Sequence, residues 1–330
     1  MEYVPVARPS GAFQQTVPAA DIEAMCRRAF GPGTSLVSAV ELGGGCYNTT
    51  YRVTLAGADQ PVILRVAPAP GRQFRVEREL MRAEHAVLPF LSPIAPLIPR
   101  TLAADFTHEV IGRDYLFQTM LDGVPGPEGI ASYPSERHGA LYRQLGEITR
   151  LIHQVRGVRF GPAAGPWHAS WSEAVVGYFT DLAADLDDLS LDSSDVRQIA
   201  AAAGRDRAVL DEVTVPRLLH GDLWTVNVML DPGADEPVIC GVFDNDRASW
   251  GDPEADWPVY LASLKPGTAR DAFWDGYGTR PSGAAAARRS LYYLARHIGA
   301  IRLELHRLGN AEKVPQTYEQ MHGLLARLTA

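Results

Sequence analysis

One stretch, from Leu219 to Asp256, constrains this chain more than any other, because it predicts a β-hairpin with polar side chains at both of its ends. Its sequence is LHGDLWTVNVMLDPGADEPVICGVFDNDRASWGDPEAD. Two apolar runs rich in β-forming residues, 227–230 and 237–243, flank an Asp-Pro-Gly turn. Because a hairpin brings its two ends together, the residues before and after it are expected to meet at one edge of a small sheet.

Three polar side chains stand at the ends of this hairpin, Asp222 and Asn227 before it and Asp244 after it. Taken singly, Asp222 could cap a turn and Asn227 could satisfy a loop backbone, which are common roles for these residues. Together, two carboxylates and an amide suit a hard divalent cation and a polyphosphate. The pattern therefore favours phosphoryl transfer, with Asp222 orienting an acceptor hydroxyl and taking its proton. His220 is expected to brace the loop by hydrogen bonding.

Composition and charge narrow the class of protein. The 330 residues carry a net charge of −8, which argues against a nucleic-acid partner. The three cysteines lie far apart and form no CxxC pair, so neither a disulfide framework nor a zinc site is expected, and a reducing compartment is indicated. The sequence has no apolar run of about 18 residues and no secretory signal, so we expect a cytoplasmic protein without a membrane-spanning segment.

The period of the apolar residues changes along the chain. It predicts short strands at first, then a helix and a further strand, and mostly helices afterwards. The strands are expected at 38–42, 49–55, 61–66 and 115–121, and the first long helix at 74–91. This order indicates an α+β chain in two lobes. We place the N-terminal lobe at 1–121, with 1–17 as a loosely attached lead-in, and the mostly helical C-terminal lobe, which carries the hairpin, at 122–330.

A family resemblance rests on two segments, LLHGDLWTVNVML and GVFDNDRASWGDPEAD. They resemble the aminoglycoside phosphotransferase and choline-kinase family, whose members are relatives of the protein kinases. The resemblance implies a bilobal protein-kinase-like fold, with an antiparallel sheet and a helix in an N-terminal, nucleotide-binding lobe. In that family the first Asp is the catalytic base, and the Asn and the Asp after the hairpin bind magnesium. By motif these roles fall to Asp222, Asn227 and Asp244, with ATP or GTP as phosphoryl donor and Mg²⁺ as cofactor.

A glycine-rich loop lies between the first two expected strands. Glycine lets backbone N–H groups approach a phosphate, although such a loop could equally be a plain hairpin turn. The resemblance makes it the nucleotide loop, with Gly44, Gly45 and Asn48 as its contacts. The strand expected at 115–121 matches the link between the lobes in the family, where backbone groups of Gln118 to Met120 would read the nucleobase.

Arg65, in the third expected strand, matches the cation that holds the α- and β-phosphates in the family. Protein kinases and many relatives have Lys there, but Arg keeps the charge and offers two parallel N–H donors to a phosphate. Glu84 matches the helix Glu that pairs with this cation, and Glu77 and Glu79 are its competitors. The resemblance therefore implies an Arg65–Glu84 pair.

The segment after the hairpin favours a small-molecule acceptor. Protein kinases carry a long segment after the metal-binding Asp, which holds the substrate peptide. Here only 12 positions separate Asp244 from Asp256, and they lack an Ala-Pro-Glu motif. The resemblance then implies a kinase that phosphorylates a hydroxyl of an antibiotic or related sugar-containing natural product, aminoglycoside-like or nucleoside, and so confers resistance.

Recognition of the acceptor is expected from the helices after residue 125. Acidic side chains there could face an amine-bearing sugar or simply form a solvated face. The candidates are Asp181, Asp185, Glu254, Asp271, Asp275 and Glu304. Six tryptophans gather in the same half, where core packing is the default role and stacking on a substrate ring is the alternative.

Two other functions stay open. One is a metabolic kinase acting on a choline-, homoserine- or fructosamine-like substrate, because His-Gly-Asp-Leu-Trp also resembles fructosamine kinases. The other is a catalytically inactive nucleotide-binding regulatory module, which only Arg65 in place of Lys favours. The intact set of Asp222, Asn227 and Asp244 argues against the inactive module.

Overall fold

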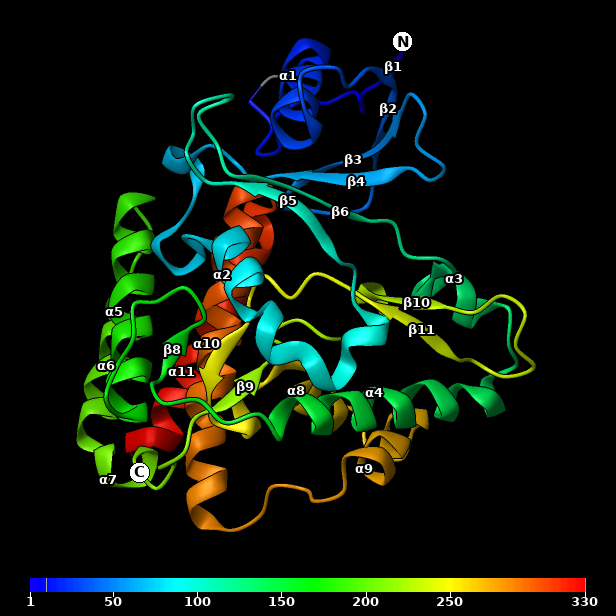
Figure 1. Ribbon diagram of the computed structural model, residues 1–330. Helices are drawn as coiled ribbons and strands as arrows, with labels where there is room; N and C mark the ends of the chain where they lie inside the picture. The colour runs from blue at the N-terminus through cyan, green and yellow to red at the C-terminus, as the bar shows by residue number, and fades with distance from the viewer. Residues whose placement is uncertain (10, 330) are drawn as a thin grey trace. The chain divides into compact units, whose positions relative to one another are not determined.

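The chain forms two compact units in the computed structural model, which describes residues 1–9 and 11–329. Unit 1 combines residues 1–73, 96–123 and 241–243. Unit 2 combines residues 74–95 and 124–240 with the chain from 244 onward. Unit 1 is built on a sheet and unit 2 is mostly helical, as expected of an α+β chain (Figure 1). The sequence is therefore not divided once, after residue 121, because 74–95 belong to unit 2 and 241–243 to unit 1.

Unit 1 is organised around a six-stranded sheet in the order β1-β2-β3-β4-β6-β5. Its strands are β1 (Glu2–Val4), β2 (Leu36–Leu42), β3 (Thr49–Leu55), β4 (Val62–Val66), β5 (Thr101–Asp105) and β6 (Tyr115–Thr119). β2, β3 and β4 form the predicted antiparallel meander. Helix α1 (Ala19–Phe30) contributes Ile22, Met25 and Cys26 to a core shared with buried side chains of β3, β4 and β6. Burial of this apolar stripe holds the helix to the sheet.

The N-terminal segment is part of this sheet, which corrects the prediction of a loosely attached lead-in over 1–17. β1 pairs in parallel with β2. The Val6 N–H donates to Glu41 Oε2 at 2.9 Å, and the Val17 N–H donates to the Tyr51 hydroxyl at 3.1 Å. Val17 itself is fully buried. The segment lacks apolar periodicity, so these long-range bonds left no pattern in the sequence.

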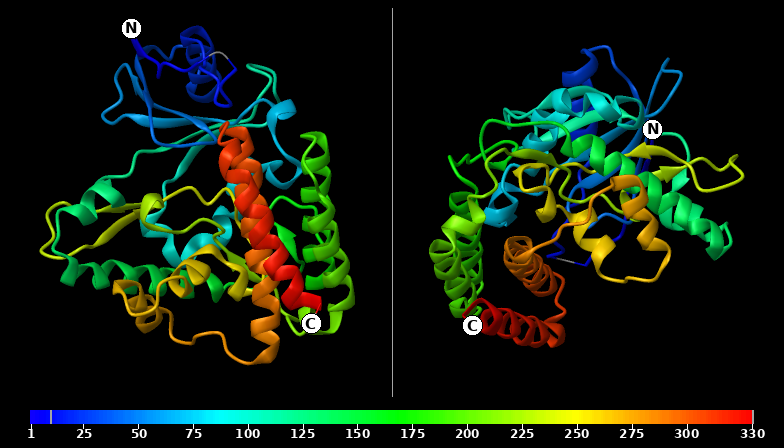
Figure 2. Two further views of the ribbon diagram at one scale, coloured as in Figure 1. Left: turned by 180° about the vertical axis from the view of Figure 1, so that it is seen from behind. Right: turned by 90° about the horizontal axis from the view of Figure 1, so that it is seen from below.

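Unit 2 is a helical body in which α5, α6, α10 and α11 share one large apolar core (Figures 1 and 2). Its helices are α2 (Leu80–Val87), α3 (Gly126–Ala131), α4 (His138–His153), α5 (Trp171–Asp188), α6 (Ser194–Arg205), α7 (Arg207–Leu210), α8 (Trp257–Ser263), α9 (Ala272–Tyr277), α10 (Ala284–Arg307) and α11 (Val314–Thr329). Ser170 caps α5 by accepting a hydrogen bond from the Glu173 N–H. No helix among the described residues is both long and apolar enough to cross a membrane.

The helix predicted at 74–91 is shorter than expected. Only residues 80–87 are α-helical, and a 3₁₀ segment, Leu88–Leu97, follows them. That segment contains three prolines, which lack the backbone N–H that an α-helix needs. Glu79, just before α2, has a φ of 59°, so the helix cannot extend backwards either.

Two small sheets carry the hairpin stretch. One has the order β11-β10-β7 and contains β10 (Val228–Leu230) and β11 (Ile239–Val242), which confirms the predicted hairpin, together with β7 (Val124–Pro125). The other has the order β8-β12-β9 and contains β8 (Gly161–Pro162), β9 (Arg217–Leu219) and β12 (Ser249–Gly251). β9 and β12 are antiparallel, with Ser249 opposite Leu219. This pairing fixes the start of the loop that carries Asp222 and the end of the loop that carries Asp244.

Candidate active site

The loop after β9 is held in place by Asp256. Its carboxylate accepts hydrogen bonds from the His220 N–H at 3.0 Å and the Gly221 N–H at 2.8 Å. It also lies 2.9 Å from His153 Nε2, on α4. Burial raises the pKa of Asp256, but these hydrogen bonds and charges outweigh burial and leave the pKa lowered. Asp256 is therefore an ionised, fully satisfied support for the loop.

Asp252 is a second support of the same kind. Its Oδ2 accepts from Arg289 Nε at 3.0 Å and from the Tyr293 hydroxyl at 2.5 Å, and its Oδ1 accepts from the Glu254 N–H at 3.1 Å. Only 4% of Asp252 is exposed. Both aspartates of the Gly-Asp-Pro-x-x-Asp segment thus serve structure through several hydrogen bonds each.

Asp222 and Asn227 meet in the loop that these supports hold. Asn227 Nδ2 donates to the Asp222 carbonyl at 2.7 Å and to its Oδ2 at 3.0 Å. The pKa of Asp222 is raised to about 7. Burial is the largest cause and nearby Asp244 adds to the rise, while Arg247 and the hydrogen bond from Asn227 oppose it. A carboxylate with a pKa near neutrality is suited to accept a proton from a substrate hydroxyl.

Asp244 follows β11 in an uncommon backbone conformation. Its φ is 62°, in the left-handed region that non-glycine residues seldom adopt. It is close enough to Asp222 and to His220 to raise the pKa of each, although burial dominates and leaves the pKa of His220 lowered. Asp222 therefore contacts Asn227 and lies near Asp244, as predicted, and His220 is a buried, uncharged brace that accepts from the Asp222 N–H at 3.4 Å.

Arg247 balances part of this negative charge. A Cβ on Gly221 would lie 2.3 Å from the Arg247 carbonyl oxygen, so the arginine's backbone packs directly against the residue before Asp222. The Arg247 guanidinium lies 3.6 Å from Glu77. Glu77 also forms an ion pair with Arg307 from α10. Glu77, a competitor of Glu84 for Arg65 in the sequence prediction, is thus bound to arginines of unit 2.

The other predicted nucleotide contacts divide between the two units. Unit 1 contains Gly44, Gly45 and Asn48 in the loop between β2 and β3, Arg65 on β4, and Gln118 and Met120 at the end of β6. Gly44 has a φ of 98°, which a side chain would disfavour. Arg65 is buried, opposite Thr50 on β3 and Leu116 on β6. Glu84 is buried on α2, in unit 2. Their roles toward a nucleotide stay predictions.

The oxygen atoms beside Asp222 fit magnesium. Within residues 1–9 and 11–329, no group of three or more His, Cys, Asp or Glu side chains is placed to hold a metal by itself. Mg²⁺, however, needs only one or two protein ligands when phosphates supply others. Asn227 engages Asp222 through its amide nitrogen, so its amide oxygen is the atom that could bind a cation, and a cation near Asp222 and Asp244 would relieve the repulsion between them. Asn227 and Asp244 are thus a suitable pair of hard ligands.

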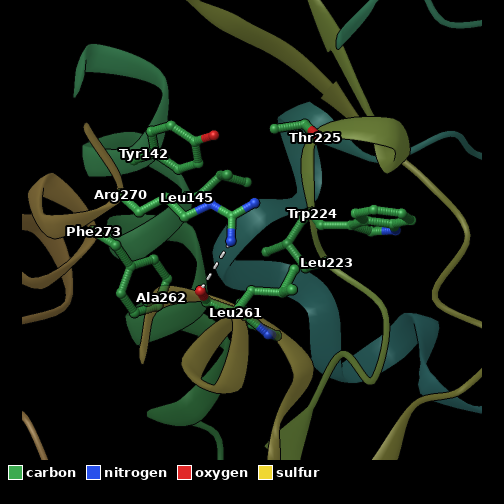
Figure 3. A pocket seen from close by; sticks show the side chains of 10 residues that line it. Tyr142, Leu145, Leu223, Trp224, Thr225, Leu261, Ala262, Arg270 and Phe273 are labelled. Atoms are coloured by element: carbon green, nitrogen blue, oxygen red, sulfur yellow. Dashed lines mark hydrogen bonds between the residues drawn. The ribbon is translucent and has the colours of Figure 1, made fainter. Parts of the chain in front are cut away.

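A small pocket opens beside the same loop, between α4, α8 and α9 (Figure 3). Arg270 reaches into it and donates to the Leu261 carbonyl at 3.4 Å. Leu223, Trp224 and Thr225 form the wall next to Asp222. Its volume is about 40 Å³, far below the several hundred Å³ of ordinary ligand pockets. It is too small to hold a sugar ring.

Several predicted acidic contacts are already engaged within the protein. Asp185 accepts from Arg75 Nη1 at 3.0 Å and from the Arg75 N–H at 2.9 Å. Glu254 accepts from Arg289 at 3.2 Å, and Asp271 pairs with Arg280 at 3.2 Å. Of the tryptophans, Trp171 is in the core and donates to the Tyr293 hydroxyl at 2.9 Å. Sequence reasoning missed Arg247 and Arg289, because an arginine outside a motif carries no signal of its partner.

Comparison with known proteins agrees with this geometry. Residues 38–294 match the model of the phosphotransferase enzyme family. An aminoglycoside 3'-phosphotransferase from Streptomyces fradiae is 30% identical over 193 residues, which are 52% of this chain and 69% of the relative.

Solved structures share the fold. A thermostable mutant of aminoglycoside phosphotransferase APH(4)-Ia, in a ternary complex with AMP-PNP and hygromycin B, has a TM-score of 0.63 at 17% identity and covers 94% of this chain and 99% of its own. The GDP and kanamycin complex of APH(2")-IIIa has a TM-score of 0.60 at 19% identity and covers 92% and 98%. These likenesses confirm the predicted fold class.

Proposed function

The chain belongs to the phosphotransferase enzyme family, and on that premise we propose that it is a small-molecule kinase. It transfers the γ-phosphoryl group of ATP or GTP to a hydroxyl of a sugar-containing natural product. Antibiotics of aminoglycoside or nucleoside type are the leading acceptors, and resistance is the consequence. The Streptomyces fradiae relative, named for aminoglycoside phosphorylation, supports an antibiotic acceptor.

The Asp222–Asn227 pair carries this proposal. Asp222 accepts a side-chain hydrogen bond from Asn227, and its pKa is raised to about 7, chiefly by burial. Asp252 and Asp256, in contrast, are each held by several donors. A half-buried carboxylate kept near neutral pKa beside an amide and a second carboxylate is an arrangement typical of functional sites.

In the proposed mechanism, Asp222 orients the acceptor hydroxyl and receives its proton as the oxygen attacks the γ-phosphorus. Asn227 fixes the Asp222 carboxylate through Nδ2, and its amide oxygen would bind the cation. Bound Mg²⁺ would neutralise phosphate charge, held by Asn227 and Asp244. The phosphates would be contacted by Gly44, Gly45 and Asn48. Arg65, with Glu84 as its proposed partner, would hold them. The backbone of Gln118 to Met120 would read the base.

A short segment after Asp244 supports a small acceptor over a protein. Asp244 is followed by β12, a 3₁₀ turn at Pro253–Ala255 and α8. The turn and the residues around it are tied to Arg289 and His153, so this segment is part of the rigid support of the loop. It offers no long mobile stretch of the kind that holds a peptide substrate.

The test is acceptor phosphorylation by the purified protein. It is incubated with MgATP or MgGTP and a panel of aminoglycosides, nucleoside antibiotics, choline, homoserine and fructosamines, and each acceptor is examined by mass spectrometry. A mass gain of one phosphoryl group on an antibiotic supports the proposal. A gain confined to choline, homoserine or a fructosamine would instead establish a metabolic kinase, and transfer to no acceptor, with nucleotide binding intact, would favour the inactive regulatory module.

A further inference from the structure

Four aromatic side chains of unit 2 gather next to the candidate catalytic loop. They are Trp224, Trp257, Tyr260 and His297, called here the aromatic cluster. Trp224 and Trp257 meet edge to face at 6.2 Å between ring centroids, and Trp257 and His297 at 4.8 Å. Tyr260 and His297 are stacked at 4.5 Å. All four are only half-buried, and Trp224 follows Asp222 by two positions, so ring surface is available to a ligand beside the catalytic carboxylate.

Three nitrogen atoms of this cluster lack hydrogen-bond partners. Trp224 Nε1, Trp257 Nε1 and His297 Nε2 are each shielded from solvent, and none has a partner within residues 1–9 and 11–329. Buried polar atoms without partners are rare in folded proteins and call for an explanation. An indole N–H can only donate a hydrogen bond, so its missing partner is an oxygen or another acceptor atom. A ligand ammonium group, which also only donates, cannot satisfy it.

Two arginines extend the cluster around the space near Asp222. Arg296, adjacent to His297 on α10, lies 4.7 Å above the ring of Tyr178 on α5. Arg247 packs against Gly221. Burial raises the pKa of Tyr178, and the charges of Arg296 and Arg247 oppose that rise. Charge interactions therefore join Asp222 to Arg247, and both Arg247 and Arg296 to Tyr178. Arg296 also acts electrostatically on His297, whose ring contacts Trp257, and Trp257 in turn contacts Trp224.

The charge of this wall is mixed, because Arg247 interacts with Asp222 and Asp246, and Asp222 with Asp244. His297 adds none, because burial and the charge of Arg296 lower its pKa to about 3. Glu77 pairs with Arg307 and Arg247, and Asp185 pairs with Arg75. Glu304 on α10 is exposed, and its charge raises the pKa of Asp222. Aromatic rings alone can bind a quaternary ammonium group, but Arg247 and Arg296 would repel it.

We propose that this wall binds a neutral or anionic acceptor with a flat ring that carries oxygen or other hydrogen-bond acceptor atoms, as the base of a nucleoside does. The ring lies against the aromatic cluster, the indole N–H groups donate to it, and the sugar hydroxyl reaches Asp222. The inference rests on the proposed function, because it names the acceptor class of the same site. It ranks acceptors with such a ring ahead of amine-rich sugars as substrates.

The experiment compares acceptors and variants with MgATP and MgGTP. Neutral nucleosides and nucleoside antibiotics are set against kanamycin, hygromycin B and choline, and kcat and KM are determined from nucleotide turnover. Nucleosides are expected to have kcat/KM values at least about 10-fold above those of the amines, since one well-made buried hydrogen bond changes binding by roughly that factor. Trp224→Phe should raise the nucleoside KM with a smaller change in kcat. Arg296→Glu should reduce the ratio of nucleoside kcat/KM to amine kcat/KM, because it replaces a positive charge with a negative one that attracts amines.

Matched controls and outcomes make the result decisive. Trp167→Phe and Arg280→Glu alter an exposed tryptophan and an exposed arginine outside the wall, and they should leave the preference unchanged. Equal or higher kcat/KM for the aminoglycosides or for choline overturns the inference and leaves the kinase assignment standing. Nucleoside turnover that Trp224→Phe and Arg296→Glu do not alter also overturns it. Transfer to no acceptor at all contradicts the proposed function and this inference with it.

Discussion

The two pairs of aspartates in the stretch 219–256 have opposite surroundings. Asp252 and Asp256 are buried and fully satisfied by arginine, tyrosine, histidine and backbone donors. Asp222 and Asp244 lie close to each other, and one has a raised pKa while the other has a left-handed backbone. Burial alone therefore does not separate structural from functional carboxylates. The useful distinction is whether the protein itself satisfies the charge or leaves it for a cation and a substrate.

Replacing Asp222 should give the largest loss of activity. Asp222→Asn keeps the size of the side chain but removes the base, so kcat is expected to fall about 10²- to 10⁴-fold. Nucleotide affinity should change little, and the free energy of unfolding should stay the same or rise, because a carboxylate whose pKa is raised by the fold lowers stability at neutral pH. Steady-state kinetics, calorimetric nucleotide titration and urea unfolding measure the three quantities. Retained activity would remove Asp222 from its proposed role.

Replacing Asp256 should give the largest loss of stability. Asp256→Ala leaves the His220 and Gly221 N–H groups and His153 without their partner. Breaking such a buried pair costs about 3–5 kcal/mol of unfolding free energy. Asp231→Ala, at an exposed turn aspartate that accepts from the Gly233 N–H, is the control and should cost about 1 kcal/mol or less. A loss at Asp256 no larger than the control would show that the loop is held in another way.

Asp244→Gly should separate activity from stability. Glycine adopts a φ of 62° without strain, so the variant is expected to gain about 1 kcal/mol of unfolding free energy. It loses a proposed magnesium ligand, so the Mg²⁺ concentration for half-maximal activity should rise about 10-fold or more. Urea unfolding and a Mg²⁺ titration check both. A destabilised variant would mean that Asp244 is a structural residue like Asp252.

Much of this contrast was accessible from the sequence. The spacing of Asp222 and Asn227 before the hairpin and Asp244 after it predicted their convergence, because a hairpin brings its own ends together. The attachment of residues 1–17 and the arginine partners of Glu77 and Asp185 were not predictable. They depend on contacts between residues far apart in the chain, for which neither period nor motif gives a signal. The aromatic cluster was likewise hidden, because α8 is short and His297 lies inside the long helix α10.

Two histidines repeat the contrast on a smaller scale. His153 lies between Asp256 and Tyr277, whereas His297 Nε2 is without a partner in the described chain. The folded-state pKa of His297, about 3, is below the unfolded value of about 6.5, so the unfolded state binds the extra proton between these values. This site therefore lowers stability as the pH falls from about 6.5 toward 3.

His297→Phe should reduce the dependence of unfolding free energy on pH in this window, because it removes one titrating site. Urea unfolding at a series of pH values measures the slope for the variant and for the wild-type protein. An unchanged slope would mean that His297 is as exposed to protons in the folded protein as in the unfolded chain.

The most direct test of the central claim is a crystal structure of the wild-type protein with Mg²⁺ and a non-hydrolysable ATP analogue. Asp222, Asn227 and Asp244 are claimed to form the phosphoryl-transfer site, with Asp252 and Asp256 as its supports. The account predicts a cation bound by Asn227 and Asp244, the Asp222 carboxylate facing the γ-phosphate, and Asp252 and Asp256 unmoved. A nucleotide or cation bound away from Asp244, with Asp222 turned from the phosphates, would contradict it.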